Sequence, residues 1–577
     1  MTWRAAGSSG GRGLTLLAGK AGGVAAPSAP GVDAARSHPA TTNRLRRPLA
    51  ACALIGLAFL SRCELISPVS AAEPQSPRAF VDTVYRPSAG RRLLVRAGGQ
   101  LQLALNAAQP GDTIVLESGA TFRGNFILPK KGGSGWIIVR SGASDALLPP
   151  PGVRAGPDTA AVMAKMVTPN SSPVIVTAPG AHHYRFIGVE FTVGKNVGRI
   201  GSIVAFGGRQ ARASDTPHHL VLDRCYVHGH RALDGFRGVL LNSGWSAIID
   251  SHISEMHVRG FDSQAILGYN GPGPFKIVNN YLEGAGENIM FGGADPLIRD
   301  LVPSDIQISG NRLIKPPAWD QADPSYNGVS WTMKNLLELK NAQRVLVEGN
   351  VLENVFGEGG AALLLTPRNQ ENSAPWSVVQ DVVFRNNIVR NVSVGAKIQG
   401  SDEGFPSQRT RRIVVSNNLW LGVSRSLAYL IAPIDDLMIE HNTAIPLRHS
   451  TYHLEGDPPL TRFRLVNNVL GFGLYGLHFA RFGKSEEWFP GAMISGNALI
   501  KDHQINGGQH ATRSPDAGAA GLPGASGVRV FEGPAAAGLG ADGHLSEGSP
   551  LKRAPGPDAG VNFDELCRAA GCEALRE

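Results

Sequence analysis

The chain has 577 residues, of which 7% are aromatic and 18% charged, and its formal net charge is +8. The first 72 residues hold eight basic and two acidic side chains, so they account for six of these eight charges. The rest of the chain is only weakly basic and has no basic stripe interleaved with aromatic residues. This pattern argues against a nucleic-acid-binding protein.

The N-terminal region has the pattern of a targeting signal. Residues 1–43 show no strand or helix periodicity, and we expect them to be disordered or to result from a wrongly assigned start. Residues 44–72 are predicted to be a signal peptide, because arginines precede the apolar stretch 49–60 and small residues precede Glu73. Twelve apolar residues are too few for a membrane span. We expect a secreted or periplasmic protein without a membrane span in the mature chain; a retained membrane anchor is the alternative.

A short helix is predicted over 101–109, where apolar and polar residues alternate with helical spacing. The turn Pro110–Asp112 and a strand over 113–116 follow it. Further strands are expected at 136–139 and 184–191. A solenoid needs a cap over its open end, and this helix is suited to that position.

One short sequence motif then recurs ten times. It consists of alternating apolar residues, one or two polar or glycine residues, one position that we call the slot, and a further apolar pair. Successive slots lie 24 to 39 residues apart. Strand-like motifs at such a period predict a solenoid. Asparagine tolerates left-handed backbone angles and can hydrogen-bond along a stack. The slots are Cys225, His252, Asn280, Asn311, Asn350, Asn387, Asn418, Asn442, Asn468 and Asn497.

The repeated motif resembles the right-handed parallel β-helix of the pectate-lyase-like superfamily. The resemblance implies an all-β fold in which residues 73–510 form the β-helix and the helix at 101–109 caps its N-terminal end. Residues 511–577, rich in Gly and Ala at their start, are expected to form an irregular C-terminal coil or cap. The fold alone does not specify a reaction, because function resides in sites placed on the fold.

Coil-by-coil alignment of the strand after each slot places one polar group on the outer surface. The aligned strands begin at Val239, Ala265, Ile289, Leu337, Leu363 and Ala396. The first and third residues of each strand are expected to point inward, for example Ala265 and Leu267. Glu338 and Lys340 then point outward. Gly268 and Gly292 fall in the Lys340 row and are expected to leave a groove beside it.

Other charged residues are expected nearby on neighbouring coils. Arg368 follows the next strand, and Asp262 and Glu287 precede earlier ones. The segment containing Glu338, Lys340 and Arg368 resembles the alginate lyase and chondroitinase B group. That resemblance implies Lys340 as the base, Arg368 as the acid, Glu338 as a Ca²⁺ ligand and an acidic polysaccharide as the substrate. The His-Gly that follows the group's Arg is Asn369-Gln370 here, and no second acidic ligand is evident on the strand.

Four residues are candidates for substrate binding: Asp262, Glu287, Asn288 and Trp331. Loops on solenoids often carry function, and an aromatic ring such as Trp331 can stack on a sugar or pack its own loop. His228, His230, His252 and His257 lie on adjacent coils and could bind metal or act as turn partners.

Three functions follow in order of preference. The first is a secreted polysaccharide-active protein, specifically a uronate lyase acting by β-elimination, in which a depressed pKa would make Lys340 a base. The alternative is a non-catalytic solenoid that binds glycans or packs in an envelope, with Lys340 and Arg368 on a solvated strand edge. The third is a glycoside hydrolase, which needs two suitably spaced carboxyl groups.

Overall fold

A computed structural model describes residues 71–357, 359–474, 485–501, 525–552, 558–571 and 573. The expected leader (1–43) and all but the last two residues of the expected signal peptide (44–72) lie outside the described residues. In the described part of the chain, no helix has both the length and the apolar content needed to cross a bilayer.

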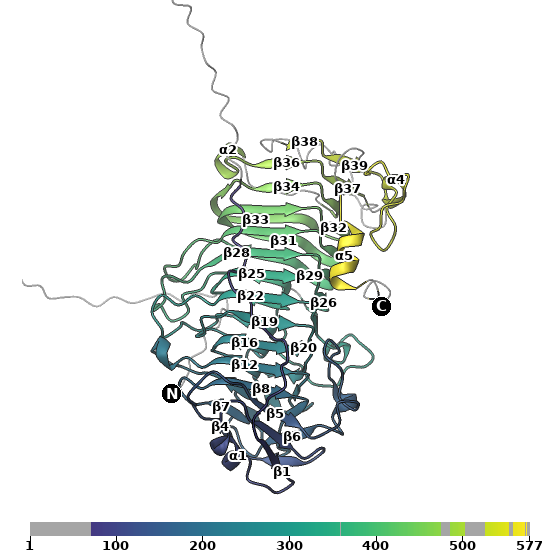
Figure 1. The fold of residues 1–577 in the computed structure, drawn as a ribbon. Helices are drawn as coiled ribbons and strands as arrows, with labels where there is room; N and C mark the ends of the chain where they lie inside the picture. The colour runs from purple at the N-terminus through teal and green to yellow at the C-terminus, as the bar shows by residue number, and fades with distance from the viewer. Residues whose placement is uncertain are drawn as a thin grey trace, which may run out of the picture. The chain divides into compact units, whose positions relative to one another are not determined.

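The chain forms a right-handed parallel β-helix, as predicted, and the described residues place 37 strands in one continuous hydrogen-bonded network. Each coil contributes strands to three parallel sheets, which share one core of buried aliphatic and aromatic side chains (Figure 1). A parallel crossover of this kind is almost always right-handed. Two long strands, β29 (Ile388–Gln399) and β31 (Leu419–Glu440), bend around the coil and join more than one sheet.

The first sheet begins each coil. Its strands are β1 (Arg92–Val95), β2 (Thr113–Leu116), β5 (Ile137–Ser141), β8 (His182–Ile187), β12 (His218–Asp223), β16 (Gly244–Ile249), β19 (Phe275–Val278), β22 (Ser304–Ser309), β25 (Ala342–Glu348), β28 (Val379–Arg385), β30 (Arg411–Ser416), β34 (Arg464–Val466), β36 (Met493–Ser495) and β38 (Ala525–Ser526).

The second sheet follows a tight turn. Its strands are β3 (Thr121–Arg123), β6 (Ala164–Thr168), β9 (Val189–Val193), β13 (Tyr226–His228), β17 (His252–Met256), β20 (Tyr281–Gly284), β23 (Arg312–Ile314), β26 (Val351–Glu353), β32 (Thr443–Leu447), β35 (Val469–Gly471), β37 (Ala498–Ile500) and β39 (Arg529–Phe531).

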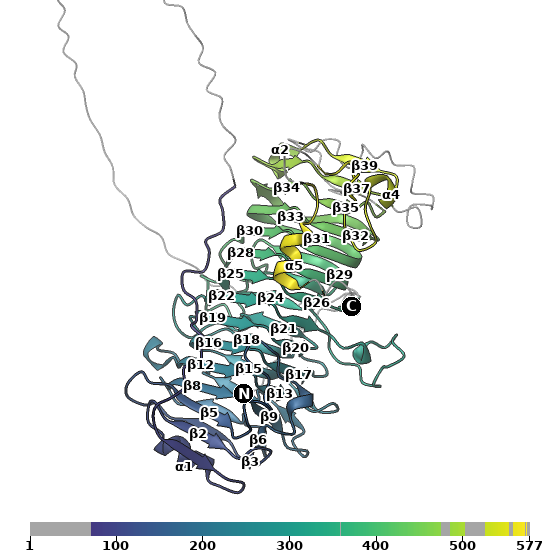
Figure 2. The same cartoon turned by 45° about the vertical axis from the view of Figure 1, so that its right-hand side comes forward.

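The third sheet closes the coil, and Figure 2 shows its middle strands stacked in file. Its strands are β4 (Phe126–Leu128), β7 (Ile175–Thr177), β11 (Val204–Phe206), β15 (Arg237–Leu241), β18 (Gln264–Gly268), β21 (Glu287–Phe291), β24 (Leu337–Leu339), β27 (Ala361–Leu365) and β33 (Ser450–Thr461). A separate pair, β10 (Arg199–Ile200) and β14 (Asp234–Gly235), lies outside these sheets.

The asparagine stack is present between the first and second sheets. From Asn280 to Asn497, each buried side chain donates its Nδ2 to the Oδ1 of the next asparagine at 2.9–3.0 Å. The same Oδ1 also accepts the main-chain N–H of the previous asparagine, as Asn311 does from Asn280. Each amide therefore satisfies its hydrogen-bonding groups inside the core, where an unmade bond is expensive.

Two details of the slot prediction are wrong. Ser251, not His252, continues the stack: its hydroxyl accepts from Cys225 N and its own N–H donates to Asn280. The left-handed backbone lies one residue before each slot, as at Asp250 and Asn279, with φ of 51° and 55°. The slot side chain can therefore point inward while the preceding residue makes the bend.

The strand alignment is wrong by one residue on a single coil. Val239 pairs with Ile266, and Gly268 pairs with Phe291. Ile266 is therefore the inward residue in place of Ala265, and Gly268 lies in the Leu339 row. Gly292 does lie beside Lys340, where an added Cβ would come within 2.6 Å of the lysine Cβ.

A helix covers the N-terminal end of the β-helix, and strands extend its C-terminal part. Helix α1 (Leu101–Ala107) buries Leu101 and Leu105 against the first coils, which agrees with the predicted cap. At the other end, β38 and β39 pair in parallel with β36 and β37, so the solenoid continues beyond residue 510. The short helices α2 (Ser485–Trp488), α4 (Pro534–Ala537) and α5 (Phe563–Ala570) lie in this C-terminal part (Figure 1).

An extended N-terminal strap, residues 71–86, runs along the first sheet and is the purple segment beside its strands in Figure 1. Three strap amides bind aspartates on successive parts of the solenoid at 2.8–2.9 Å. They are Ala72 with Asp436, Gln75 with Asp381 and Arg78 with Asp305. Each aspartate also pairs at 2.6–2.7 Å with an arginine of a following coil: Arg462, Arg412 and Arg344, respectively.

Replacing one ladder asparagine should destabilise the fold. Asn350→Ala removes acceptors and donors that are fully buried, so we expect the free energy of unfolding to fall by about 2–4 kcal/mol. Urea unfolding followed by circular dichroism measures this change. Asn106→Ala on the exposed face of α1 is the control and should change stability by less than about 0.5 kcal/mol. An Asn350→Ala loss no larger than this control would contradict the role of the ladder.

Candidate active site

The candidate site lies on the outer face of the third sheet, on strands β18, β21 and β24. Leu337 and Leu339 enter the core, so the residue between them, Glu338, points away from it. Glu338 pairs in register with Met290, while Gln264 pairs with Glu287 one coil earlier. Three coils therefore bring these side chains to one patch of surface.

Glu338 and Lys340 form the centre of the patch. Lys340 Nζ lies 3.0 Å from Glu338 Oε1, and Asn335 Nδ2 donates to Glu338 Oε2 at 2.9 Å. The glutamate side chain is 3% exposed, whereas the lysine side chain is 16% exposed. Lys340 is therefore the member of this pair that a ligand can reach.

Glu287 supplies a second, fully buried carboxyl group beside Glu338. Gln264 Nε2 donates to Glu287 Oε2 at 2.7 Å. Burial first, and then the charges of Glu338 and Asp262, raise the pKa of Glu287 to about 8. Like charges this close cannot both stay ionised, so Glu287 keeps its proton at neutral pH.

The same arrangement keeps Lys340 charged. Burial acts to lower the pKa of Lys340, but the charges of Glu338 and Glu287 outweigh it and raise the pKa above its ordinary value. Although burial opposes it, the Lys340 ammonium holds the pKa of Glu338 below its ordinary value. A cationic lysine has no lone pair to accept a proton, so this geometry opposes the expected role of Lys340 as a general base.

Asp262 and Lys334 form the accessible rim of the patch. Their side chains are 36% and 43% exposed, and Lys334 Nζ lies 2.6 Å from Asp262 Oδ1. Although burial acts to lower it, the Asp262 carboxylate raises the pKa of Lys334. The patch therefore presents two cations and one carboxylate to solvent above two buried acids.

Lys315 is a residue that sequence reasoning missed. It follows β23, is fully buried, and donates from Nζ to the carbonyls of Gly284, Ala285, Gly286 and Asn335 at 2.7–3.1 Å. These bonds fix the turn just before Glu287. A single lysine followed by two prolines carries no sequence signal for such a role.

The structure brings the main chain of Arg368 beside Lys340 but gives its side chain other partners. Arg368 N donates to Lys340 O at 2.9 Å. The guanidinium binds Asp402 at 2.8 Å and reaches Gln399 at 3.4 Å, and its side chain is 29% exposed. Arg368 therefore lies on the adjacent coil as expected, and its charge is shared with Asp402.

Asn288 and Trp331, two candidates for substrate binding, are buried. Asn288 donates from Nδ2 to the carbonyls of Leu282 and Ile314. The Trp331 indole stacks on His257, with ring centroids 3.8 Å apart. These contacts favour structural roles, and for Trp331 they favour loop packing over sugar stacking.

Ca²⁺ does not fit Glu338 as the residues are arranged. Calcium takes six to eight oxygen ligands. Both Glu338 oxygens already accept hydrogen bonds from protein donors, and Lys340 places a positive charge 3.0 Å away. Among the described residues, the acidic groups of this patch do not converge as a set of metal ligands. We therefore derive no step through calcium.

No family model matches this chain, and no curated protein matches it. Among solved structures it is similar to a PL6-family alginate lyase, at 15% identity and a TM-score of 0.47 over 84% of this chain and 58% of the other. Pectate lyase Pel9A is 12% identical with a TM-score of 0.36 over 82% and 97%. A GH87 α-1,3-glucanase from Streptomyces thermodiastaticus strain HF3-3 is 10% identical with a TM-score of 0.41 over 83% and 73%. This chain spans just over half of the alginate lyase, and the likeness is one of fold alone.

The raised pKa of Glu287 should make stability depend on pH. The folded protein holds a proton at Glu287 up to about pH 8, whereas the unfolded chain releases it near 4.5. Between these values the native state holds a proton at Glu287 that the unfolded chain has released, so the contribution of this group to stability falls as pH rises, by up to about 1.4 kcal/mol per pH unit.

Glu287→Gln, which keeps a donor beside Glu338 and cannot ionise, should remove this contribution, so the stability of the variant should fall less steeply, or rise more steeply, with pH than that of the wild type. Urea unfolding at pH 5.5, 6.5 and 7.5 measures it. Glu117→Gln, on the surface near the N-terminal cap, is the control and should keep the wild-type slope. A Glu287→Gln variant with the wild-type slope would show that Glu287 is ionised in the folded protein.

Proposed function

We propose that this protein is a secreted or periplasmic lyase that cleaves an acidic polysaccharide by β-elimination on the outer face of the third sheet. The observation that carries the proposal is a reachable Lys340 ammonium paired with the buried Glu338 carboxylate, next to the exposed Asp262–Lys334 pair. The expected signal peptide supports export, although it lies outside the described residues.

Uronate elimination makes specific chemical demands. The C5–H bond is weakly acidic until the adjacent carboxylate is neutralised, because the carbanion places its charge on that carboxylate. A base must then take the C5 proton as the C4–C5 double bond forms and the C4–O4 bond breaks. The leaving oxygen finally acquires a proton.

The structure supports a revised assignment of these roles. Lys340, kept cationic by the Glu338 carboxylate 3.0 Å away, is suited to neutralising the substrate carboxylate and the charge that develops on it. Asp262 is the exposed carboxylate that can accept the C5 proton. Arg368 can hydrogen-bond the leaving oxygen; because a guanidinium keeps its protons, solvent supplies the proton.

The residues in register with Glu338 on later coils form an outward row that is suited to binding a long polysaccharide chain. After Leu364, the row contains Lys397, Tyr429 and His453 on successive coils. Lys397 lies over the Tyr429 ring, and the Tyr429 and His453 rings stack with centroids 4.7 Å apart. Four coil steps span about 19 Å at the parallel strand spacing. Such a row can contact several sugar units, through charge and through ring stacking.

Non-catalytic glycan binding is the second candidate. The observation that favours it is the burial of both glutamates, which leaves one carboxylate, Asp262, to act as base in the patch. Hydrolysis by Glu287 and Glu338 fits less well. Glu287 is 0% exposed and Glu338 3% exposed, so neither carboxyl group is accessible to a glycosidic bond, as both members of a glycosidase pair must be.

Variants of Lys340 separate these functions. Alginate, pectate and glycosaminoglycans are incubated with the protein while unsaturated product is followed in the ultraviolet. We expect Lys340→Ala to lower the rate by about 100-fold, the effect of losing one charge-stabilising donor. Lys340→Arg should keep part of the activity, because the cation remains, whereas a general-base lysine would give two equally inactive variants.

The control is Lys195→Ala in an exposed loop, which should leave the rate unchanged, and circular dichroism verifies that each variant folds. Reducing ends without new absorbance would indicate hydrolysis. Binding without any product, at saturating polysaccharide, would contradict the lyase proposal and favour the glycan-binding function.

Removing divalent cations should not stop the proposed reaction. Lys340 takes the part that Ca²⁺ was expected to play, so dialysis against EDTA should leave the rate within about twofold of the untreated enzyme. The measurement is the same ultraviolet assay with and without added CaCl₂. A loss above 10-fold that CaCl₂ restores would contradict the Lys340 assignment and return Ca²⁺ to the site.

A further inference from the structure

Four histidines meet where β8 and β12 begin, on a different sheet from the candidate active site. His182 and His218 pair in register, and His183 and His219 follow them on the two coils. His183 and His219 have left-handed backbones, with φ of 61° and 55°. This bend turns the second histidine of each pair back toward the first.

The four rings form two stacked layers. His182 lies over His218 at 4.8 Å between centroids, with planes 4° apart, and His183 lies over His219 at 4.3 Å and 8°. Within each coil the two Nδ1 atoms are in contact, at 2.8 Å for the His182–His183 pair and 2.7 Å for the other. One ring of each pair must donate and the other accept, so the rings hold opposite tautomers.

Three of these histidines converge in the manner of metal ligands. His183, His218 and His219 each offer a ring nitrogen, and the three nitrogens lie within 4.8 Å of one another. Zinc binds imidazole nitrogens at about 2.0–2.1 Å, so two nitrogens on one tetrahedral ion lie about 3.4 Å apart. Small ring rotations would therefore bring these three onto a single ion, with the backbone unchanged.

The rings are already in the form that binds metal. Burial, and then neighbouring histidines, lower the pKa of His183 and of His219 to about 4. Burial, and then the charges of His182 and Lys130, also lower the pKa of His218. Neutral imidazole is the ligand form, and it is present here at neutral pH without the loss of a proton.

A cavity of about 280 Å³ borders His219 and gives access to the cluster. Its walls include Trp136 and Trp245 of the solenoid and Phe80 and Tyr85 of the strap. The Trp245 ring is stacked on His219 with centroids 5.6 Å apart and is 40% exposed. The cavity leaves room for a water or an exogenous group beside the cluster.

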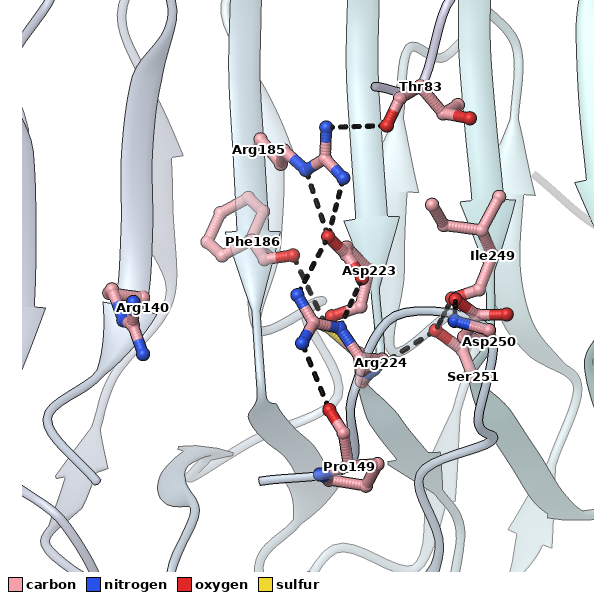
Figure 3. Close-up of polar contacts among 12 residues, drawn as sticks. Thr83, Arg140, Pro149, Arg185, Phe186, Asp223, Arg224, Ile249, Asp250 and Ser251 are labelled. Carbon is pink, nitrogen blue, oxygen red and sulfur yellow. Dashed lines mark hydrogen bonds and ion pairs between the residues drawn. The ribbon is translucent and has the colours of Figure 1, made fainter. Parts of the chain in front are cut away.

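Buried arginines secure the strap at this cavity (Figure 3). Arg185 donates to the carbonyl of Thr83 at 3.0 Å and to Asp223 at 2.6 and 3.0 Å. Arg224 binds the same carboxylate at 2.7 Å and the carbonyl of Pro149 at 3.0 Å. Arg185 therefore holds the strap wall of the cavity in place, and Asp223 positions both arginines.

We propose that His183, His218 and His219 form a binding site for one divalent transition-metal ion of the zinc, nickel or copper class, with an open position toward the cavity. Imidazole donors favour these ions, whereas calcium and magnesium prefer oxygen ligands. The open position would accept water or a small ligand, as it does in zinc sites with three protein ligands.

Calorimetric titration of the purified, untagged protein with ZnCl₂, NiCl₂ and CuSO₄ at pH 7.5 tests this proposal. We expect one ion per chain for at least one metal, with micromolar or tighter affinity. His219→Gln and His183→Gln should each weaken binding by 10-fold or more, and the double variant should abolish it. His230→Gln, an exposed histidine on a nearby coil, is the control and should bind as the wild type does.

Absence of binding for all three metals, or equal affinity of the double variant and the wild type, would overturn the proposal. So would equal weakening by His230→Gln, because it would indicate adventitious binding to surface histidines. If the histidine variants misfold, fluorescence provides a second measurement on a folded protein.

Cu²⁺ should quench the tryptophan emission of the wild type, and EDTA should restore it. Trp245→Phe should show less quenching, because the Trp245 ring is stacked on His219. Identical quenching in Trp245→Phe and wild type would contradict the site.

Discussion

The structure depends on the parallel hydrogen bonds between successive coils, which repeat at about 4.8 Å and leave little freedom in register. The asparagine stack reinforces this spacing from inside, because each Oδ1 accepts two donors from the previous coil. Every other feature follows from this repeat. Residues 20 to 40 positions apart in sequence become lateral neighbours, and a side chain of given chemistry recurs in a row along the solenoid.

Charged side chains of the solenoid are paired with opposite charges in two places. Near the start of the first-sheet strands, a row of residues with positive φ alternates aspartate with arginine from Asp305 to Arg462, and the strap adds main-chain donors to the aspartates. On the third sheet, Glu338 instead pairs with Lys340 of the same coil, while the nearby Glu287 is accommodated by keeping its proton. Burying like charges side by side therefore changes protonation instead of breaking the fold.

The same repeat builds two surfaces of different chemistry. The outer face of the third sheet carries cations, a carboxylate and stacked rings over several coils, which suits an extended anionic chain. The start of the first sheet carries paired imidazoles beneath a strap that arginines hold down, which suits a single metal ion. Neither surface requires a separate domain. Each added coil extends the rows of outward-facing side chains and leaves the core of the other coils unchanged.

The sequence by itself determined the coil period, the parallel β-helix, the capping helix and the outward direction of Glu338 and Lys340. These properties depend on local alternation and on a repeated asparagine, which are visible within a few residues. Only the tertiary structure decided which residue faces which across coils. Because the loops differ in length, the β18 register differs by one residue from the expected alignment, and Glu287 and Trp331 are buried. For the same reason Arg368 pairs with Asp402, and Lys315 lies beneath the site. Protonation followed from those distances, so the change of Lys340 from an expected base to a cation could not be predicted from the residue order alone.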